Sequence, residues 1–486
     1  MLEFQMDAEK VGSAMPHYWE KCVGSCHAYT ALREDWRKQL AKVHRVMGFE
    51  YVRFHGLFDN DMSVLTIDPK TKKIRYCFVN IDSIFDFLLK IGMKPFLELS
   101  FMPDALASGE KTCFHYRANI TMPKNIDDWD QFIKCFTRHL VERYGLAEVR
   151  SWFFEVWNEP NLSYFFDGTQ ADYFRLYEHT VRSIKSVDGM IAVGGPATAI
   201  NDWIPEFITF CRKNKVPLDF ISTHHYPTDD PLWHKDSSSL KDKLKLTNSN
   251  GQINYERGIL KKMSLKARQE AGSFPLYYTE WNSSAYLPDQ IHDYPYTAAF
   301  AAKSIIDNIG VVDGYSYWTF TDIFEEQGQI PGEFHGGFGM QTIHGIPKPV
   351  YHTFEFLHQL GTERISITPE QETVGFVATR RENSYRLVGY NYNIPKDGIL
   401  NQLVRIVVKN KACKMVKAFL VDNKHGNTCK KWIQMGSPVY PNDNELDQLF
   451  HASAIHSEIL PFRKNGNDSM VEFTLAPDAV ILLDIE

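Results

Sequence analysis

Two glutamates at the ends of strand-like segments are the residues of this sequence best suited to chemistry. The first, Glu159, follows an aromatic and β-branched run within residues 152–161, which read WFFEVWNEPN. Pro160 cannot continue a strand and biases the residue before it toward extended geometry, so this carboxylate is expected at a strand end. The second, Glu280, closes a similar run within residues 276–282, which read LYYTEWN. Two such carboxylates predict an enzyme that works with a carboxylate pair.

A carboxylate pair suits the cleavage of a glycosidic bond. That reaction needs a proton for the leaving oxygen and support for an oxocarbenium-like centre. If the two carboxyl groups stand about 5–5.5 Å apart, one is a nucleophile and the anomeric configuration is retained. Either Glu159 or Glu280 alone could be a salt-bridged strand end. Both, however, are flanked by Trp and Asn, and the pair together favours catalysis.

Short apolar strands alternate with amphipathic helices up to about residue 360. Helical spacing is visible, for example, at Trp36, Leu40, Val43 and Met47. The strands are expected at residues 22–25, 51–54, 95–99, 152–157, 191–193, 219–222, 276–278 and 314–318. Eight repeats of this alternation predict an α/β fold with a closed (β/α)8 TIM barrel, whose active site lies at the carboxyl ends of the strands.

The pattern changes after the barrel. Alternating segments such as residues 374–379 and 480–485 predict an accessory antiparallel β-sandwich at the C-terminus. The expected organisation is a catalytic barrel at residues 15–360 and a sandwich domain at residues 361–486, with residues 1–14 possible as a further strand of the sandwich. The polar stretch at residues 236–252 is expected to be a surface excursion after the sixth strand.

The composition narrows the class of protein. Of 486 residues, 44% are hydrophobic and 23% are charged, as in a soluble globular protein with a large core. The net charge of -7 argues against a nucleic-acid partner, and no apolar run reaches membrane-spanning length. The eight Cys lack metal-ligand spacing and suggest free thiols in a reducing compartment. With no signal peptide visible, a cytoplasmic location is expected, or a secreted one if a leader has been removed.

Several segments together carry a resemblance to a known family. Residues 156–161, VWNEPN, look like the acid/base segment of retaining glycosidases with a (β/α)8 barrel. More closely, the chain resembles glycoside hydrolase family 39 and, within it, the bacterial β-xylosidase branch. The other matching segments are CVGS at 22–25, RFHG at 53–56, MPDALASG at 102–109, VGGP at 193–196, YWTFTD at 317–322 and FHGGFG at 334–339. The combination is specific to the family, whereas Asn-Glu-Pro alone is specific only to its clan.

The resemblance implies that Glu159 is the general acid/base and Glu280 the nucleophile. Before attack, the charge of ionised Glu280 would keep Glu159 protonated. Once Glu280 is esterified to sugar, that repulsion ends and Glu159 can act as a base toward water. Asn158 is expected to hydrogen-bond the sugar 2-hydroxyl, a contact that strengthens in the transition state.

The sixth strand supplies the next residues that the resemblance implies. His224 is expected near sugar hydroxyls, and the hydroxyl of Tyr226 on the nucleophile. The two can share a face because residues two apart in a strand point the same way. His225 should face away, and because adjacent His side chains diverge, a metal site is not expected. The remaining substrate-binding residues that the resemblance implies are His55, Trp318, Glu326, Phe114 and Tyr116. No cofactor is expected.

The sequence departs from the family at one position near the nucleophile. Bacterial xylosidases of this family often carry a Tyr five residues after it, where this chain has Ala285, followed by Tyr286. The expected function is a retaining, exo-acting β-xylosidase that releases xylose from the non-reducing ends of small oligosaccharides or aryl glycosides. One alternative is another glycone, namely α-L-iduronide, arabinoside, glucoside or galactoside; an iduronide would need cations such as Arg53 and Arg117. A second is a non-catalytic carbohydrate-binding barrel. The oligomeric state stays open.

Overall fold

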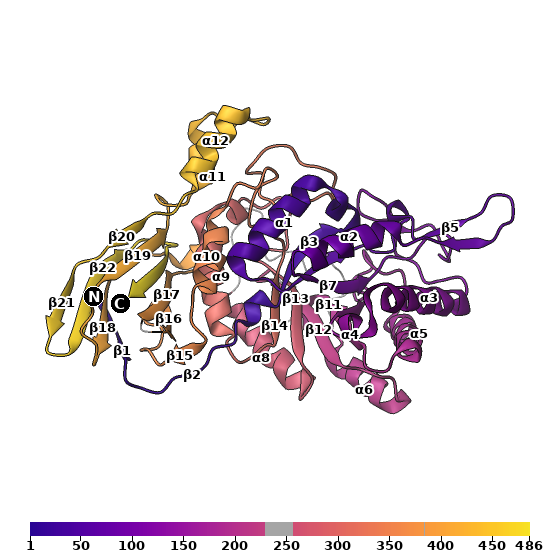
Figure 1. Ribbon diagram of the computed structural model, residues 1–486, viewed down its shortest axis with the longest axis horizontal. Helices are drawn as coiled ribbons and strands as arrows, with labels where there is room; N and C mark the ends of the chain where they lie inside the picture. The colour runs from indigo at the N-terminus through magenta and orange to yellow at the C-terminus, as the bar shows by residue number, and fades with distance from the viewer. Residues whose placement is uncertain (229–255, 383) are drawn as a thin grey trace.

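Eight parallel strands close into a barrel at the centre of the larger part of the molecule (Figure 1). The computed structural model describes residues 1–228, 256–382 and 384–486. The expected excursion at residues 236–252 lies outside them. The strands follow each other around the barrel in chain order, which confirms the predicted TIM barrel. They are β3 (Cys22–His27), β4 (Tyr51–His55), β7 (Lys94–Leu99), β10 (Phe153–Val156), β11 (Ala192–Thr198), β12 (Phe220–His225), β13 (Leu276–Trp281) and β14 (Gly314–Tyr317).

Helices surround the barrel and pack apolar side chains against it. Along α1, Trp36, Leu40, Val43 and Met47 are all buried, as the helical spacing predicts. The helix ends at Gly48, whose φ of 75° is a left-handed conformation that favours glycine. The barrel helices are α1 (Glu34–Met47), α2 (Val79–Lys90), α3 (Ile126–Tyr144), α5 (Gln170–Val187), α6 (Ile204–Asn214), α8 (Ile259–Ala271), α9 (Pro295–Asp307) and α10 (Pro349–His358). Shorter elements in the connections are α4 (Leu146–Val149), β5 (Leu65–Ile67), β6 (Ile74–Tyr76), β8 (Thr112–Cys113) and β9 (Ala118–Asn119).

The C-terminal module consists of two packed sheets, as the alternating segments predicted. The seven-stranded sheet has the order β2 (Ser13–Ala14), β15 (Glu363–Ile365), β16 (Val374–Arg381), β17 (Ser384–Asn391), β23 (Val480–Ile485), β19 (Val416–Val421) and β20 (Ser457–Ile459). The second sheet has the order β1 (Leu2–Asp7), β18 (Gln402–Lys409), β22 (Asp468–Leu475) and β21 (Phe462–Asn465). Its pairing is antiparallel except that β1 runs parallel to β18. Because the first strand, β1, and the last strand, β23, both belong to this module, both chain ends lie in it. A separate apolar core, including Phe4, Val404 and Leu483, fills the module.

Two helices between β19 and β20 project from this module, and the sequence pattern had not indicated them (Figure 1). They are α11 (Thr428–Gln434) and α12 (Asp443–Ala452). A capping box begins α12: the Asn442 side chain accepts from the amide of Glu445, whose carboxylate accepts from the amide of Asn442. That motif was the signal in the sequence from which this helix could have been found.

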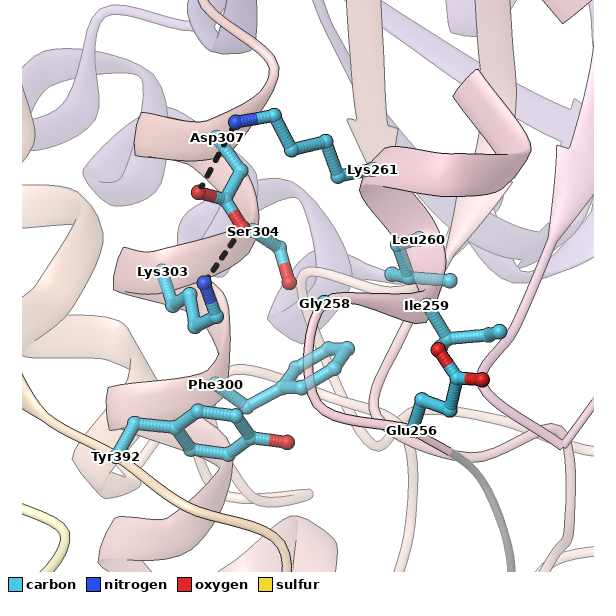
Figure 2. A pocket seen from close by; sticks show the side chains of 10 residues that line it. All are labelled: Glu256, Gly258, Ile259, Leu260, Lys261, Phe300, Lys303, Ser304, Asp307 and Tyr392. Carbon is cyan, nitrogen blue, oxygen red and sulfur yellow. Dashed lines mark hydrogen bonds and ion pairs between the residues drawn. The ribbon is translucent and has the colours of Figure 1, made fainter. Parts of the chain in front are cut away.

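The module packs against helix α9 of the barrel through aromatic rings and buried charges (Figure 2). Tyr392 of the module lies over Phe300, with ring centroids 5.9 Å apart. Lys303 of α9 donates to Asp307 at 2.7 Å and to Glu370 of the module at 3.1 Å. Asp307 lies in α9 itself, so the ion pair between buried Lys303 and Glu370 is the one that joins the barrel to the module. Among the described residues, no helix combines the length and hydropathy that a bilayer crossing requires.

Candidate active site

A sharp backbone turn presents Glu159 at the mouth of the barrel. Strand β10 ends at Val156, and the next residues include two left-handed conformations, at Trp157 (φ 70°) and at Glu159 (φ 42°). The amide of Glu159 donates to the carbonyl of Ala197, near the end of the neighbouring strand β11, at 2.8 Å. Positive φ values are costly for residues with a side chain and cluster at functional sites. The turn therefore aims a carboxylate that a continued strand would carry elsewhere.

Glu280 is buried near the end of β13 and is surrounded by donors. Its Oε1 accepts from Arg53 at 2.8 Å, and its Oε2 accepts from the hydroxyl of Tyr226 at 2.9 Å. His55 Nε2 lies 3.7 Å from Oε1. Burial raises the pKa of Glu280, and the positive charges of Arg53 and His55 oppose that rise. These donors hold both oxygens of the Glu280 carboxylate in position.

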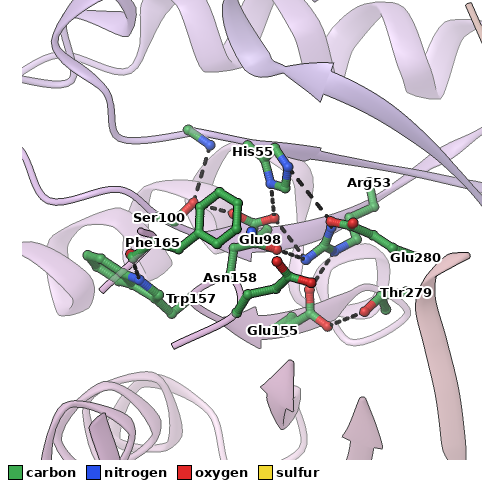
Figure 3. Close-up of polar contacts among 12 residues, drawn as sticks. Arg53, His55, Glu98, Ser100, Glu155, Trp157, Asn158, Phe165, Thr279 and Glu280 are labelled. Atoms are coloured by element: carbon green, nitrogen blue, oxygen red, sulfur yellow. Dashed lines mark hydrogen bonds and ion pairs between the residues drawn. The ribbon is translucent and has the colours of Figure 1, made fainter. Parts of the chain in front are cut away.

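Arg53 organises the floor of the site with all three guanidinium nitrogens engaged (Figure 3). Its Nε donates to Glu155 at 2.5 Å and its Nη1 to Glu280 at 2.8 Å. Its Nη2 donates to Asn158 Oδ1 at 3.0 Å and lies 2.9 Å from Glu98. Arg53 thus lies beneath the site and interacts with four acceptors. These contacts occupy its guanidinium group and argue against a role in binding a sugar carboxylate. Because Asn158 accepts through its oxygen, its amide nitrogen is left to donate.

A buried chain of hydrogen bonds fixes the position of a proton at Glu159. The hydroxyl of Thr279 donates its only hydrogen to Glu155 Oε1 at 2.8 Å. The hydroxyl oxygen of Thr279 must therefore accept from His224 Nε2, which lies 3.0 Å away. Burial, together with the charges of Arg53 and His55, holds the pKa of His224 well below its ordinary value. A neutral His224 with its proton on Nε2 presents a lone pair on Nδ1, 2.9 Å from Glu159 Oε1. Glu159 must then donate, which means that it carries the proton.

The two carboxylates lie close together. Glu159, His224 and Glu280 each place one nitrogen or oxygen atom within 4.8 Å of the other two. Such atoms could also hold a metal ion. In this structure, the two nitrogens of His224 lie within hydrogen-bonding distance of Thr279 and Glu159. A contact of this length between one oxygen of each carboxylate is compatible with the separation of about 5–5.5 Å in a retaining pair.

His55 lies beside the carboxylates among aromatic rings. Its Nδ1 is 2.6 Å from Glu98, and its Nε2 is 3.5 Å from Glu326. Burial lowers the pKa of His55, but Glu98, Glu326 and Glu280 outweigh it and raise the pKa to about 10. Its ring lies 4.8 Å from the ring of Trp318 and 5.9 Å from that of Phe114, centroid to centroid. The structure thus brings these predicted residues together around one space.

Another predicted residue, Tyr116, lies one layer further out. Its ring stacks on that of His27, with centroids 3.7 Å apart, and His27 also lies 3.3 Å from Glu325. The ring of Tyr116 lies 5.1 Å from that of Phe114, centroid to centroid, so Tyr116 is placed behind Phe114.

Two more residues singled out in the sequence do not join the carboxylates. His225 faces away from them and lies 2.7 Å from the hydroxyl of Tyr315. Ala285 is exposed, and its amide donates to Thr228.

Sequence reasoning missed the acidic layer beneath the site. Glu98, Glu155 and Thr279 had no place in the expected site, and Arg53 was considered only for a sugar carboxylate. The signal was present: Arg53, Glu98 and Glu155 each interrupt an apolar strand, and all three are fully buried. A charged residue inside an apolar strand needs a partner of opposite charge. A single sequence does not say which strand supplies that partner.

Comparison with known proteins places this geometry in a family. The model of glycosyl hydrolases family 39 matches residues 2–469. A β-xylosidase from Caldicellulosiruptor saccharolyticus is 49% identical over 96% of this chain and 95% of its own. A β-xylosidase from Geobacillus stearothermophilus is 34% identical over 96% of this chain and 92% of its own. The crystal structure of a monomeric β-xylosidase from Caulobacter crescentus superposes with a TM-score of 0.89 at 29% identity, covering 100% of this chain and 99% of that one. The chain therefore belongs to glycosyl hydrolases family 39 and is a glycosidase.

Proposed function

We propose that this glycosidase is a retaining, exo-acting β-xylosidase that removes xylose from the non-reducing ends of short xylooligosaccharides. The proximity of Glu159 and Glu280, with one oxygen of each within 4.8 Å, carries the proposal. The two β-xylosidases that match nearly the whole chain support the choice of sugar. An α-L-iduronidase from Homo sapiens matches 40% of this chain at 26% identity.

In the first step, Glu280 attacks the anomeric carbon while Glu159 gives its proton to the departing glycosidic oxygen. The bond to the leaving group breaks, and a glycosyl ester forms on Glu280. The hydrogen-bond polarity at His224 supports this role, because it keeps the proton on Glu159 before attack. Tyr226 and Arg53 hold the nucleophile in position through its two oxygens.

In the second step, Glu159 removes a proton from water, which attacks the same carbon. The ester bond breaks, and xylose leaves with its original anomeric configuration. His55 and Glu326 supply polar partners for the hydroxyls of the sugar, and Trp318 supplies an aromatic floor. Asn158, held by Arg53, is free to donate its amide to the 2-hydroxyl. Phe114, with Tyr116 behind it, closes the side of the pocket.

The test is hydrolysis of a panel of nitrophenyl glycosides by the wild-type protein, Glu159→Ala and Glu280→Ala. We expect β-xyloside turnover that is lost in Glu280→Ala and restored to Glu159→Ala by azide, which needs no general base. Turnover confined to another sugar would keep the mechanism and contradict the choice of xylose. No turnover of any glycoside would sink the proposal and favour a carbohydrate-binding role.

A further inference from the structure

Three side chains with metal-ligand chemistry meet on the opposite side of the barrel from the carboxylate pair. Glu20 belongs to the short helix η1 (Tyr18–Glu20), which lies just before the amino end of β3, and His17 precedes it. His358 is the last residue of α10. One donor atom from each of the three lies within 4.8 Å of the other two. Their side chains are 16%, 13% and 38% exposed for His17, Glu20 and His358, so the cluster is reachable from solvent.

The ring of His17 lies between a backbone carbonyl and a carboxylate. Its Nε2 lies 3.3 Å from the carbonyl oxygen of Gly361, and its Nδ1 lies 2.6 Å from Glu20 Oε1. A hydrogen on Nε2 would donate to the carbonyl and leave Nδ1 as the atom that can bind a metal ion beside the carboxylate. A backbone carbonyl that fixes the tautomer of a histidine is also the usual outer partner of a metal ligand.

His358 adds a second ring to the same oxygen. Its Nδ1 lies 3.0 Å from Glu20 Oε1, the atom that His17 also approaches. A hydrogen on Nδ1 of either ring can bridge to this oxygen. A divalent cation would replace these hydrogens and bind both rings and the carboxylate through the same three atoms.

The surrounding chain holds these ligands in place. The ring of His17 stacks on buried Trp19, with centroids 4.7 Å apart and planes at 22°. Gly48 ends α1 beside the cluster, at a φ of 75°. A Cβ at Gly48 would lie 2.5 Å from His358 Cε1 and 2.6 Å from Glu20 Oε2. Glycine at this position therefore creates the space in which the carboxylate and the second ring meet.

We propose that His17, Glu20 and His358 form a binding site for a divalent transition-metal ion such as Zn²⁺. Two imidazole nitrogens and one carboxylate oxygen are a common zinc ligand set, with a fourth position for water. Bond lengths of about 2.0–2.2 Å require ligand atoms roughly 3.3 Å apart, so shifts below about 1 Å complete the geometry. The ion would join the N-terminal segment, the last barrel helix and, through Gly361, the start of the β-module. His17 and Glu20 are close in the sequence, but His358 is 338 positions from Glu20, so the three do not form a recognisable metal motif.

The test is a zinc titration of the full-length, metal-free protein against a chromophoric chelator. We expect one site in the wild-type protein, weakened at least about tenfold in His358→Gln and in Glu20→Gln, since each removes a ligand. His344→Gln is the matched control, because His344 pairs with Glu333 elsewhere on the surface and should leave the site intact. Zinc should also raise the Tm of the wild-type protein and not that of His358→Gln. Circular dichroism of the metal-free variants checks that they fold.

Zinc binding at the proposed site must be distinguished from zinc binding at Glu159, His224 and Glu280, which could also hold this ion. Zinc at that site would inhibit glycoside hydrolysis, whereas zinc at His358 should leave the rate unchanged. Equal zinc affinity in the wild-type protein and in His358→Gln would overturn the proposal, as would the absence of binding. In a parallel experiment, Co²⁺ should give visible absorption bands of a nitrogen-ligated site in the wild-type protein, and these bands should disappear in His358→Gln.

Discussion

Replacement of Thr279 by valine tests the proton position at the acid/base residue. The change keeps the shape of the side chain and removes the hydroxyl that donates to Glu155 and accepts from His224. In the variant, a hydrogen on His224 Nε2 has no acceptor, so the tautomer with its proton on Nε2 is no longer stabilised by this hydrogen bond. The alternative tautomer, with the proton on Nδ1, can donate to Glu159 and thereby favours the ionised carboxylate. Glu159 should therefore lose its proton at lower pH than in the wild-type protein.

The size of the effect follows from the lost hydrogen bond. A buried donor without a partner costs about 1–3 kcal/mol. Thr279 therefore stabilises the His224 tautomer that has its proton on Nε2 by about this free energy, relative to the other tautomer. At 1.36 kcal/mol for each pKa unit, the alkaline limb of kcat/KM should move down by about one to two pH units. Above that limb, hydrolysis should fall by roughly tenfold to a hundredfold, while at acidic pH it should change little.

The assay is the pH profile of kcat/KM for two aryl xylosides. A nitrophenyl xyloside needs protonation of its leaving group and should show the full shift in Thr279→Val. A dinitrophenyl xyloside, whose leaving group departs without a proton, should keep most of its rate. Thr279→Ser retains the hydroxyl and should behave like the wild-type protein. An unchanged profile in folded Thr279→Val, or an equal loss on both substrates at every pH, would refute the reasoning.

Three further predictions concern the folded state. Glu155→Gln leaves Arg53 short of a buried counter-charge and should lower the free energy of unfolding by about 3–5 kcal/mol, measured by urea denaturation against the wild-type protein. His55 has a folded pKa raised to about 10, so its stabilising contribution is complete below about pH 6.5 and declines as the pH rises toward 10. The difference in unfolding free energy between the wild-type protein and His55→Gln should shrink across that window, and a constant difference would contradict the charged His55. Asn442→Ala removes the cap of α12 and should cost about 1 kcal/mol, seen as faster amide exchange in α12 with xyloside hydrolysis unchanged; unaltered exchange would contradict the capping role.

The barrel strands and the carboxylate pair could be predicted because their signals are local. An apolar run followed by Pro160 marks a strand end, and Glu280 closes a similar run. The layer beneath them depends on which strand faces which across the barrel. Arg53 meets Glu155 102 positions away in the chain, a separation that no local pattern encodes. The helices α11 and α12 were missed because they are short, and their tertiary setting outweighs weak periodicity.

The left-handed turn at Glu159 is a further example of this limit. The sequence placed the carboxylate at a strand end because of Pro160, but it did not reveal that Trp157 and Glu159 both have positive φ values. Neither residue type favours that conformation, so the surrounding barrel must impose it. Backbone conformations at a functional site therefore had to be read from the structure.

The most direct measurement is to trap the covalent intermediate on the proposed nucleophile. Incubation with a 2-deoxy-2-fluoro-β-xyloside that carries a good leaving group slows both steps, because the fluorine destabilises the oxocarbenium-like transition state and the leaving group restores only the first. Peptide mass spectrometry should then find one fluoroxylosyl group, attached to Glu280, and Glu280→Ala should remain unlabelled. Labelling of another residue, or full turnover without any label in the wild-type protein, would contradict double displacement through Glu280.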